Sequence, residues 1–167
     1  MMKKLSSKGI KILKIIHLFF AVLWIGGGIA LLVVLFGINP MNGDELYMKS
    51  RIIQLIDDCL IIPGALASFF IGIVYGIWTN WGFFKHRWIT VKWVVTIAQI
   101  LFGTFVLGPW VNETVDIANE LRDAAMTDAT LLHNIEMSQT YGTIQVIILV
   151  VAFLVVSVLK PWKKKKS

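Results

Sequence analysis

Four long apolar segments dominate the pattern of hydrophobic and polar positions along this chain. They cover residues 15–38, 59–78, 88–110 and 141–159, with lengths of 24, 20, 23 and 19 residues. A helix needs about 20 residues to cross roughly 30 Å of hydrocarbon, so each segment has the length of one membrane span. The sequence therefore predicts an all-α, polytopic membrane protein, a bundle of four transmembrane helices.

The segments between these spans also show helical spacing. From Asp44 to Asp58 the pattern indicates that the second helix begins before it enters the membrane. Beyond Pro109, apolar residues recur every three or four positions with acidic residues between them, from Val111 to Ala125. This pattern predicts an extra amphipathic helix, resting on the bundle or on the membrane surface. No linker or repeat divides the chain, so we expect residues 1–167 to form one domain.

Composition excludes several classes of function. Apolar residues make up 57% of the 167 residues and charged residues only 16%, whereas soluble domains are about 25% charged. The longest piece outside the spans, residues 111–140, is too short for a soluble catalytic domain, a Rossmann unit or a nucleotide-binding module. Cys59 is the only cysteine, so neither an internal disulfide nor a cysteine-rich iron–sulfur site is expected.

The distribution of charge predicts the orientation in the membrane. With the N-terminus inside, the cytoplasmic segments hold 13 of the 16 basic residues, and all ten acidic residues fall in or beside the outer segments. The positive-inside rule then places both termini in the cytoplasm, with the four spans in the cell's inner (plasma) membrane. The lysines 163–166 after Trp162 are expected to contact anionic lipid. Nothing in this tail resembles a base-stacking element, so no nucleic-acid partner is expected.

One face of the first span carries a histidine among small and aromatic residues. His17, Ala21, Trp24 and Gly28 follow one another at spacings of 4, 3 and 4, which places them on one side of a helix. Together with Gly27 they form a wall for a flat cofactor in one interpretation. In the other, the glycines serve helix packing and His17 hydrogen-bonds a neighbour.

The third span repeats this spacing with Lys92, Thr96, Gln99 and Gly103. Polar side chains in hydrocarbon are costly and normally face the interior of a bundle, so this stripe is a candidate site. Lys92 alone is also explained by snorkelling to the headgroups.

The second span carries a small-residue face that includes Gly72 and Gly76. Such a face permits helix pairing within one chain or between two copies, as in a homo-oligomer.

The histidines limit any haem chemistry. Iron in haem takes imidazole, thiolate, thioether or phenolate ligands, and the chain has only His17, His86 and His133. Two bis-histidine haems are therefore excluded by counting, and one haem near the cytoplasmic face remains. His17 is the expected axial metal ligand. His86 is either the second ligand or a solvated loop residue.

The outer side offers a different candidate site. Asp57, Asp58, His133 and Glu136 are placed where they can converge near Tyr141. Oxygen and imidazole ligands of this kind bind divalent metals, but no recognised ligand spacing is present. An acidic outer surface explains most of them equally well.

The string His-Leu-Phe-Phe-Ala-Val-Leu-Trp-Ile-Gly-Gly from His17 to Gly27 resembles the first helix of a bacterial family of small four-helix membrane proteins of unknown function. The resemblance continues through Ile62-Pro63-Gly64-Ala65, Arg87-Trp88-Ile89-Thr90-Val91-Lys92, Gly108-Pro109-Trp110 and Lys160-Pro161-Trp162.

A more distant similarity is to HemJ-type protoporphyrinogen oxidases and CopD-type membrane proteins. The HemJ-type pattern has a histidine seven residues before a tryptophan and a small-residue pair, as His17, Trp24 and Gly26-Gly27 have here. That family is associated with b-type haem and carries an essential lysine on a later helix, which implies a catalytic role for Lys92. The chain lacks a histidine near the outer end of helix 1, and this departure concerns the oxidase activity more than haem binding.

These observations lead to three functional hypotheses. The first is a protein that binds one b-type haem for electron transfer or tetrapyrrole oxidation. In this hypothesis His17 is an axial ligand, Lys92 pairs with a propionate or a substrate carboxylate, and Trp24 packs on the macrocycle. The second is a non-enzymatic membrane component that binds a partner protein or lipid. The third is a small ion or metal transporter that uses the outer carboxylates. Whether the protein is an enzyme stays open at this point.

Overall fold

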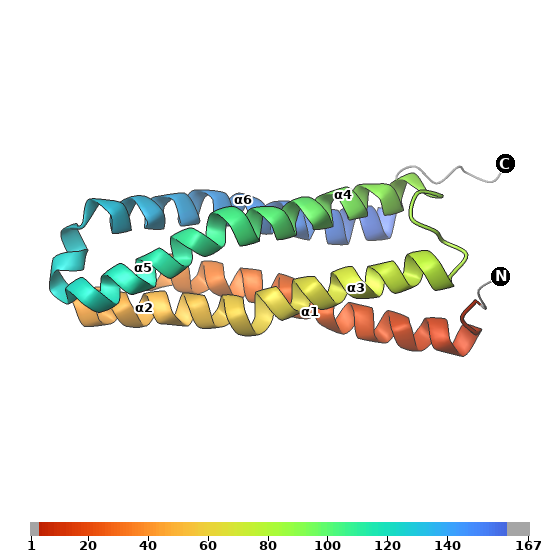
Figure 1. The fold of residues 1–167 in the computed structure, drawn as a ribbon, viewed down its shortest axis with the longest axis horizontal. Coiled ribbons are helices and arrows are strands. Elements are labelled where there is room, and N and C mark those ends of the chain that lie inside the picture. Colours follow the sequence, from red (N-terminus) through yellow and green to blue (C-terminus); the bar gives the residue numbers. More distant parts are fainter. Residues whose placement is uncertain (1–3, 160–167) are drawn as a thin grey trace.

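The computed structural model describes residues 4–159, which form four long antiparallel rods of helix (Figure 1). The first rod is one helix, the second and third each contain a π-helical turn, and the fourth is one helix. In chain order the elements are α1 (Ser7–Gly37), α2 (Gly43–Ile56), the π-turn η1 (Asp57–Ile61), α3 (Ile62–Trp78), α4 (Arg87–Phe102), the π-turn η2 (Gly103–Leu107), α5 (Gly108–Leu121), the 3₁₀ turn η3 (Arg122–Thr127) and α6 (Ala129–Leu159).

All four rods are long and apolar enough to cross a membrane, and residues 4–159 contain no strand. The predicted all-α, four-helix architecture of a multi-pass membrane protein is therefore confirmed. The lysines 163–166, which we expect to contact anionic lipid, lie outside the described residues.

A proline stands two positions after the end of each π-turn. Pro63 stands in the first turn of α3 and Pro109 in the first turn of α5. Proline has no N–H, and its ring collides with the carbonyl four residues earlier in a regular α-helix. Just before each proline the hydrogen bond spans five residues instead, from Ile62 N–H to the Asp57 carbonyl and from Gly108 N–H to the Gly103 carbonyl. The wider turn lets both helices pass a proline without a break.

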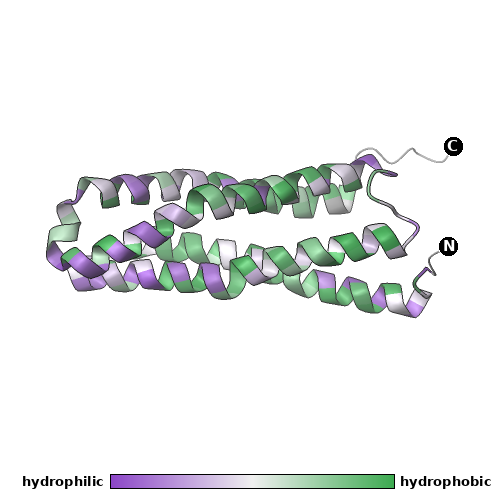
Figure 2. Cartoon of the chain, in the orientation of Figure 1, coloured by the Kyte–Doolittle hydropathy of each residue, from purple (hydrophilic) through white to green (hydrophobic). Residues whose placement is uncertain are grey.

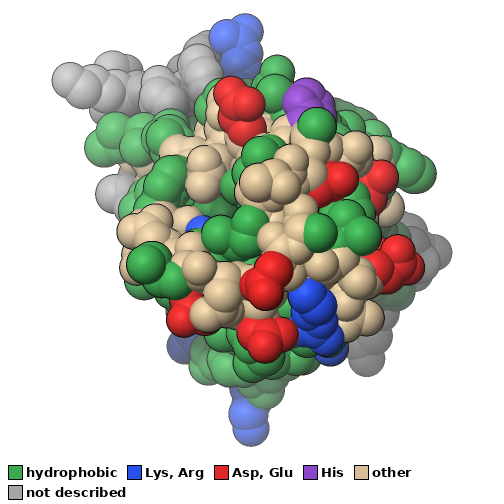
Figure 3. All heavy atoms as spheres, turned by 90° about the vertical axis from the view of Figure 1, so that its left-hand side faces the viewer, with side chains coloured by type: hydrophobic (Ala, Val, Ile, Leu, Met, Phe, Trp, Pro, Cys, Tyr) green, Lys and Arg blue, Asp and Glu red, His purple; other side chains and the backbone are tan. Residues whose placement is uncertain are grey.

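The end of the bundle that holds residues 38–58 and 108–140 carries all ten acidic residues, and we call it the acidic end. Its polar colouring contrasts with the apolar rods in Figure 2, and Figure 3 shows acidic side chains spread around this face. It has a small apolar core of its own, which consists of Leu46, Ala118, Ala125 and Leu131. The predicted amphipathic helix is α5, which continues the third rod and packs on α2 and α6.

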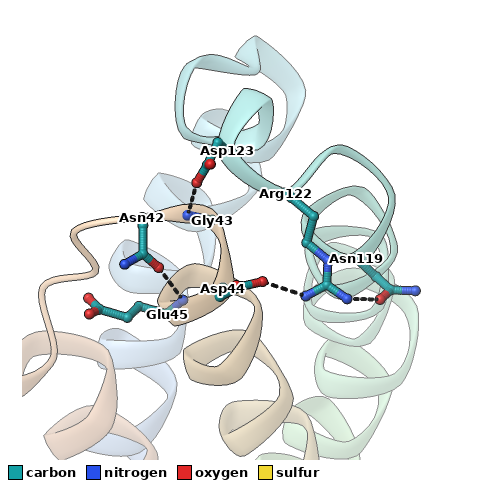
Figure 4. Close-up of polar contacts among 7 residues, drawn as sticks. All are labelled: Asn42, Gly43, Asp44, Glu45, Asn119, Arg122 and Asp123. Atoms are coloured by element: carbon teal, nitrogen blue, oxygen red, sulfur yellow. Dashed lines mark hydrogen bonds and ion pairs between the residues drawn. The ribbon is translucent and has the colours of Figure 1, made fainter.

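A clasp joins the start of α2 to the η3 turn at the acidic end (Figure 4). The backbone N–H of Gly43 donates to the Asp123 carboxylate at 2.7 Å, and Asn42 accepts from the N–H of Glu45 at 2.9 Å. A Cβ atom on Gly43 would lie 2.0 Å from the backbone carbonyl carbon of Arg122. Only glycine allows this approach of two backbones.

Arg122 holds the other side of the clasp. Its φ angle of 50° is the only positive φ of a non-glycine residue among residues 4–159. The guanidinium pairs with the Asp44 carboxylate at 3.3 Å, donates to Asn119 at 2.9 Å and lies 4.3 Å from the centre of the Tyr47 ring. These contacts offset the cost of the unfavourable backbone angle.

The opposite end holds residues 4–14 and 79–92, which contain seven basic residues and no acidic one, and we call it the basic end. Here the chain before α1 is tied to the end of α3. The N–H of Leu5 donates to the Trp78 carbonyl at 3.0 Å, and Lys4 Nζ donates to the Thr79 carbonyl at 2.7 Å. These bonds hold the segment before α1 against the end of α3.

Replacing Gly43 by alanine should destabilise the fold by about 1–3 kcal/mol, because the new methyl group meets a backbone that cannot rotate away. The measurement is the free energy of unfolding in detergent micelles. Gly37→Ala is the matched control, since a Cβ atom there meets nothing within 4 Å. Equal stability of the two variants would contradict the clasp.

Candidate functional site

Two partly open cavities lie between the helices of the bundle, one above the other along its axis. The acidic-end cavity has a volume of about 660 Å³ and the basic-end cavity about 250 Å³. Ala65 and Ser68, one turn apart on α3, line different cavities, and so do Gln99 and Thr96 on α4. The layer between them is therefore about one helical turn, or roughly 5 Å, thick.

This layer is apolar. Trp24 of α1 and Phe153 of α6 meet edge to face, with ring centres 5.8 Å apart. Trp24, Ala65 and Leu149 form its buried core. A Cβ atom on Gly64 would lie 2.7 Å from the backbone nitrogen of Trp24, so this glycine lets α1 and α3 approach closely.

All four rods line the acidic-end cavity, and the most buried charge in its wall is Lys49. The Lys49 side chain is 8% exposed and its Nζ donates to the carbonyl of Leu35, in the last turn of α1, at 2.8 Å. A cation suits this place because the carbonyls at a helix C-terminus carry partial negative charge. Beside it, the Ser50 hydroxyl donates to the Leu46 carbonyl at 2.8 Å. The ammonium group of Lys49 thus already has a hydrogen-bond partner in the last turn of α1.

Asp57 and Asp58 line the same cavity from the π-turn η1. Asp57 is half-buried and Asp58 is exposed. Among the residues that the structure describes, no side chain donates a hydrogen bond or forms an ion pair with either carboxylate. Ionisable groups inside a spanning helix are costly and usually mark a site for a ligand or an ion. The two carboxylates are therefore the least satisfied charges in the cavity wall.

Gln99 and Gln145 tie α4 to α6 at the inner limit of this cavity. Each side-chain amide donates to the other residue's backbone carbonyl, Gln99 at 2.9 Å and Gln145 at 2.8 Å. One side-chain N–H donor of each glutamine and one backbone carbonyl of each are thus bonded across the two helices.

The basic-end cavity brings His17 and Lys92 together. Both residues line it, His17 from α1 and Lys92 from α4. The His17 ring meets the Tyr75 ring edge to face at 5.8 Å, and its Nδ1 atom is buried without a hydrogen-bond partner in the described part of the chain. Lys92 Nζ lies 5.7 Å from the centre of the Trp88 ring and 5.6 Å from that of Phe153.

The other residues named from the sequence lie elsewhere or are divided between the cavities. Thr96 lines the basic-end cavity, whereas Trp24, Gly28, Gln99 and Gly103 line the acidic-end cavity.

Gly27 packs against η1. A Cβ atom there would lie 2.9 Å from Leu60 Cβ. His86 is exposed before α4, stacks on Trp88 at 6.2 Å and is not among the residues that line either cavity.

Gly72 and Gly76 face neighbours within the same chain. A Cβ atom on Gly76 would lie 2.4 Å from the Phe83 ring, and one on Gly72 would lie 3.4 Å from Trp93. Both positions of this small-residue face are thus occupied by packing inside one bundle.

The outer carboxylates do not assemble into a metal site. Within residues 4–159, no group of three or more His, Cys, Asp or Glu side chains is placed to hold a metal ion. Asp57 and Asp58 line the cavity, whereas His133 and Glu136 are exposed on α6.

Sequence reasoning missed Lys49 and Ser68. Lys49 lies on the same helix face as Leu46 and Ile53, so a lysine on an apolar stripe was the available signal. Ser68 is 3% exposed and lines the basic-end cavity, and its hydroxyl has no partner in the described structure.

Comparisons of the chain with protein-family models, with curated proteins and with solved structures find no significant match. The family resemblance inferred from the sequence stays a prediction, and function is inferred from the cavities.

Replacing Gln99 by leucine should lower the free energy of unfolding by about 0.6 kcal/mol, the average for a hydrogen bond between membrane helices, and by at most about 1.7 kcal/mol. Gln145→Leu should cost a similar amount. Denaturation in mixed micelles measures both. Gln139→Leu is the control, because this α6 side chain makes no hydrogen bond within the described residues. If Gln99→Leu loses no more unfolding free energy than Gln139→Leu, the Gln99–Gln145 pair does not stabilise the bundle.

Proposed function

We propose that this protein binds a small amphipathic molecule inside its helix bundle, with the acidic-end cavity as the site and a positively charged head group beside Asp57 and Asp58. It works as a non-enzymatic membrane component in this proposal. We also propose that it lies in a bacterial inner membrane with both termini in the cytoplasm, because its basic residues gather at one end of the bundle and its acidic residues at the other.

The observation that carries the proposal is the size and lining of this cavity. Its volume of about 660 Å³ lies within the range of roughly 300–1,000 Å³ that is typical of small-molecule sites. Trp24, Ala65 and Leu149 make its inner part apolar, whereas Asp57 and Asp58 lie toward the acidic end. This graded lining suits a molecule with an apolar tail and a polar head.

The charge of the head group follows from the partners of the three ionisable residues in the cavity wall, Lys49, Asp57 and Asp58. Lys49 is already bonded to the Leu35 carbonyl. Asp57 and Asp58 repel one another and receive no hydrogen bond from the described residues. A cationic head group is the partner that would stabilise them.

Filling the cavity should abolish binding. Gly142 is buried and lines the cavity, and a Cβ atom on it meets nothing within 4 Å, so Gly142→Leu places a side chain in open space. We expect this variant to bind dodecyltrimethylammonium at least ten times more weakly than the unaltered chain. Equilibrium binding to the full chain in lipid nanodiscs, with empty nanodiscs subtracted, measures the difference.

Gly26→Leu provides the matched control, because Gly26 is exposed on α1 and a Cβ atom there also meets nothing within 4 Å. Its binding should equal that of the unaltered chain. Unchanged binding in Gly142→Leu would refute the cavity as the site. Equal binding of dodecanol would refute the cationic head group.

A second candidate function is the binding of one b-type haem in the basic-end cavity, for electron transfer or tetrapyrrole oxidation. One observation favours it, the buried Nδ1 of His17 without a partner in a cavity that Lys92 also lines. The side chains of this cavity suit haem, because His17 would ligate the iron and Lys92 would pair with a propionate. The volume argues against it, because about 150 Å³ holds a single benzene ring and the enclosed part of this partly open cavity has about 250 Å³, which is too little to enclose four pyrrole rings.

An absorption spectrum decides this second candidate. If haem binds, protein purified in mild detergent from haem-replete cells should show a Soret band that His17→Ala abolishes. His133→Ala is the control, because His133 is exposed at the acidic end, and it should leave the band unchanged. A colourless preparation of the unaltered chain removes the candidate.

A further inference from the structure

One face of the second rod, which runs from α2 through η1 into α3, lines the acidic-end cavity. Every fourth residue on this face belongs to the cavity wall, namely Lys49, Ile53, Asp57, Ile61 and Ala65. Each step of four residues rises about 6 Å along the helix axis, so the face gives the order of charges with depth. From the acidic end inward, that order is an ammonium group, a carboxylate and an apolar wall.

The positive charge of Lys49 has no anionic partner in the described part of the chain. Its side chain is buried, and its hydrogen bond goes to the neutral backbone carbonyl of Leu35. It forms no ion pair with an aspartate or glutamate among residues 4–159. An ammonium group has three N–H donors, and burying a charge is costly unless an opposite charge pairs with it. Lys49 can therefore still donate to an anion that enters the cavity.

The charges of Lys49 and Asp57 are separated along the cavity wall. The two residues lie eight positions apart, which corresponds to about 12 Å along the helix axis, and the buried side chain of Ile53 lies between them. They do not pair with each other. One ligand can therefore present a different charged group to each of them.

Ser138 of α6 adds a hydrogen-bond donor to the same wall. It lines the acidic-end cavity, and its hydroxyl oxygen is buried without a partner in the described structure. Ser138 lies about 17 Å nearer the acidic end than Leu149, which shares a buried core with Ala65. By the same measure, Asp57 lies about 12 Å and Lys49 about 24 Å from Ala65 toward that end. Ser138 is thus placed in depth between the two charged residues.

We propose that the acidic-end cavity binds a zwitterionic amphiphile whose cationic group is attached to the apolar tail and whose anionic group lies beyond it. This inference rests on the proposed function and adds a second charge to the head group. The cation lies beside Asp57 and Asp58, and the anion lies nearer the acidic end, beside Lys49 and Ser138.

The order of the two charges distinguishes this class of ligand from other zwitterions. Alkyl betaines and alkyl sulfobetaines carry the cation next to the tail. Phosphocholine amphiphiles carry the phosphate next to the tail and the cation outside it. In the same cavity they would place the phosphate at the depth of Asp57 and the cation at the depth of Lys49, beside charges of the same sign.

The experiment compares dodecyl sulfobetaine, in which a dodecyldimethylammonium group carries a propanesulfonate arm, with dodecylphosphocholine. The two probes have the same tail and opposite charge order. Equilibrium binding to the full chain in lipid nanodiscs, with empty nanodiscs subtracted, measures both. The sulfobetaine should bind about ten times more tightly or better, as expected when charged hydrogen bonds replace like-charge contacts. This comparison uses the unaltered chain and does not depend on how any variant folds.

Lys49→Gln tests the ionic contact itself. The affinity for the sulfobetaine should fall about tenfold or more. Dodecyltrimethylammonium should bind this variant more tightly than it binds the unaltered chain, because a positive charge has left the wall. Damage to the cavity would weaken both ligands, so the opposite directions identify a charge effect. Lys49→Arg should keep most of the affinity for the sulfobetaine, and Ser138→Ala should weaken it about two- to tenfold.

Arg51→Gln is the matched control, because it removes the same charge from an exposed position of α2 outside the cavity lining. Its affinity for each ligand should equal that of the unaltered chain. Equal binding of the two zwitterions, or unchanged binding of the sulfobetaine by Lys49→Gln, overturns this inference. If dodecyltrimethylammonium still binds the unaltered chain, the proposed function survives that result. If it does not bind, the proposed function fails and this inference fails with it.

Discussion

Hydrocarbon offers no water to a polar group, so the N–H groups, carbonyls and charged side chains within this bundle have to find their partners in the protein. In the π-turns before Pro63 and Pro109, backbone hydrogen bonds continue up to the proline. Gln99 and Gln145 each bond a side-chain amide to the other's backbone carbonyl. Among the described residues, the buried side-chain polar atoms without a hydrogen bond, such as the Ser68 hydroxyl, belong to residues that line the cavities. Unsatisfied polarity in this fold is therefore concentrated where a ligand can reach it.

The lengths of the four apolar segments were sufficient to predict the all-α bundle, because the thickness of hydrocarbon determines how long a spanning helix must be. The π-turns were not predicted, although the two prolines inside apolar segments were a visible signal. The wider turn depends on backbone bonds that no hydropathy pattern records.

The candidate site was predictable in part. His17 and Lys92 line one cavity, as their similar depth suggested, but Trp24 lines the other. Residues at spacings of 4 and 3 share a helix face, yet seven residues also rise about 10 Å along the axis. Periodicity therefore predicted which side of the helix each residue occupies. It did not predict on which side of the apolar layer between the two cavities each side chain lies.

The apolar layer between the two cavities, around Trp24 and Phe153, also has an electrical consequence. Wherever water fills the two cavities, the conducting solution reaches to within about one helical turn on either side, so most of the transmembrane voltage falls across this aromatic layer. Moving one elementary charge through 100 mV corresponds to about 2.3 kcal/mol. With both cavities filled from opposite sides of the membrane, the layer around these two rings would be the part of the protein most exposed to changes in membrane potential, although neither ring carries a charge.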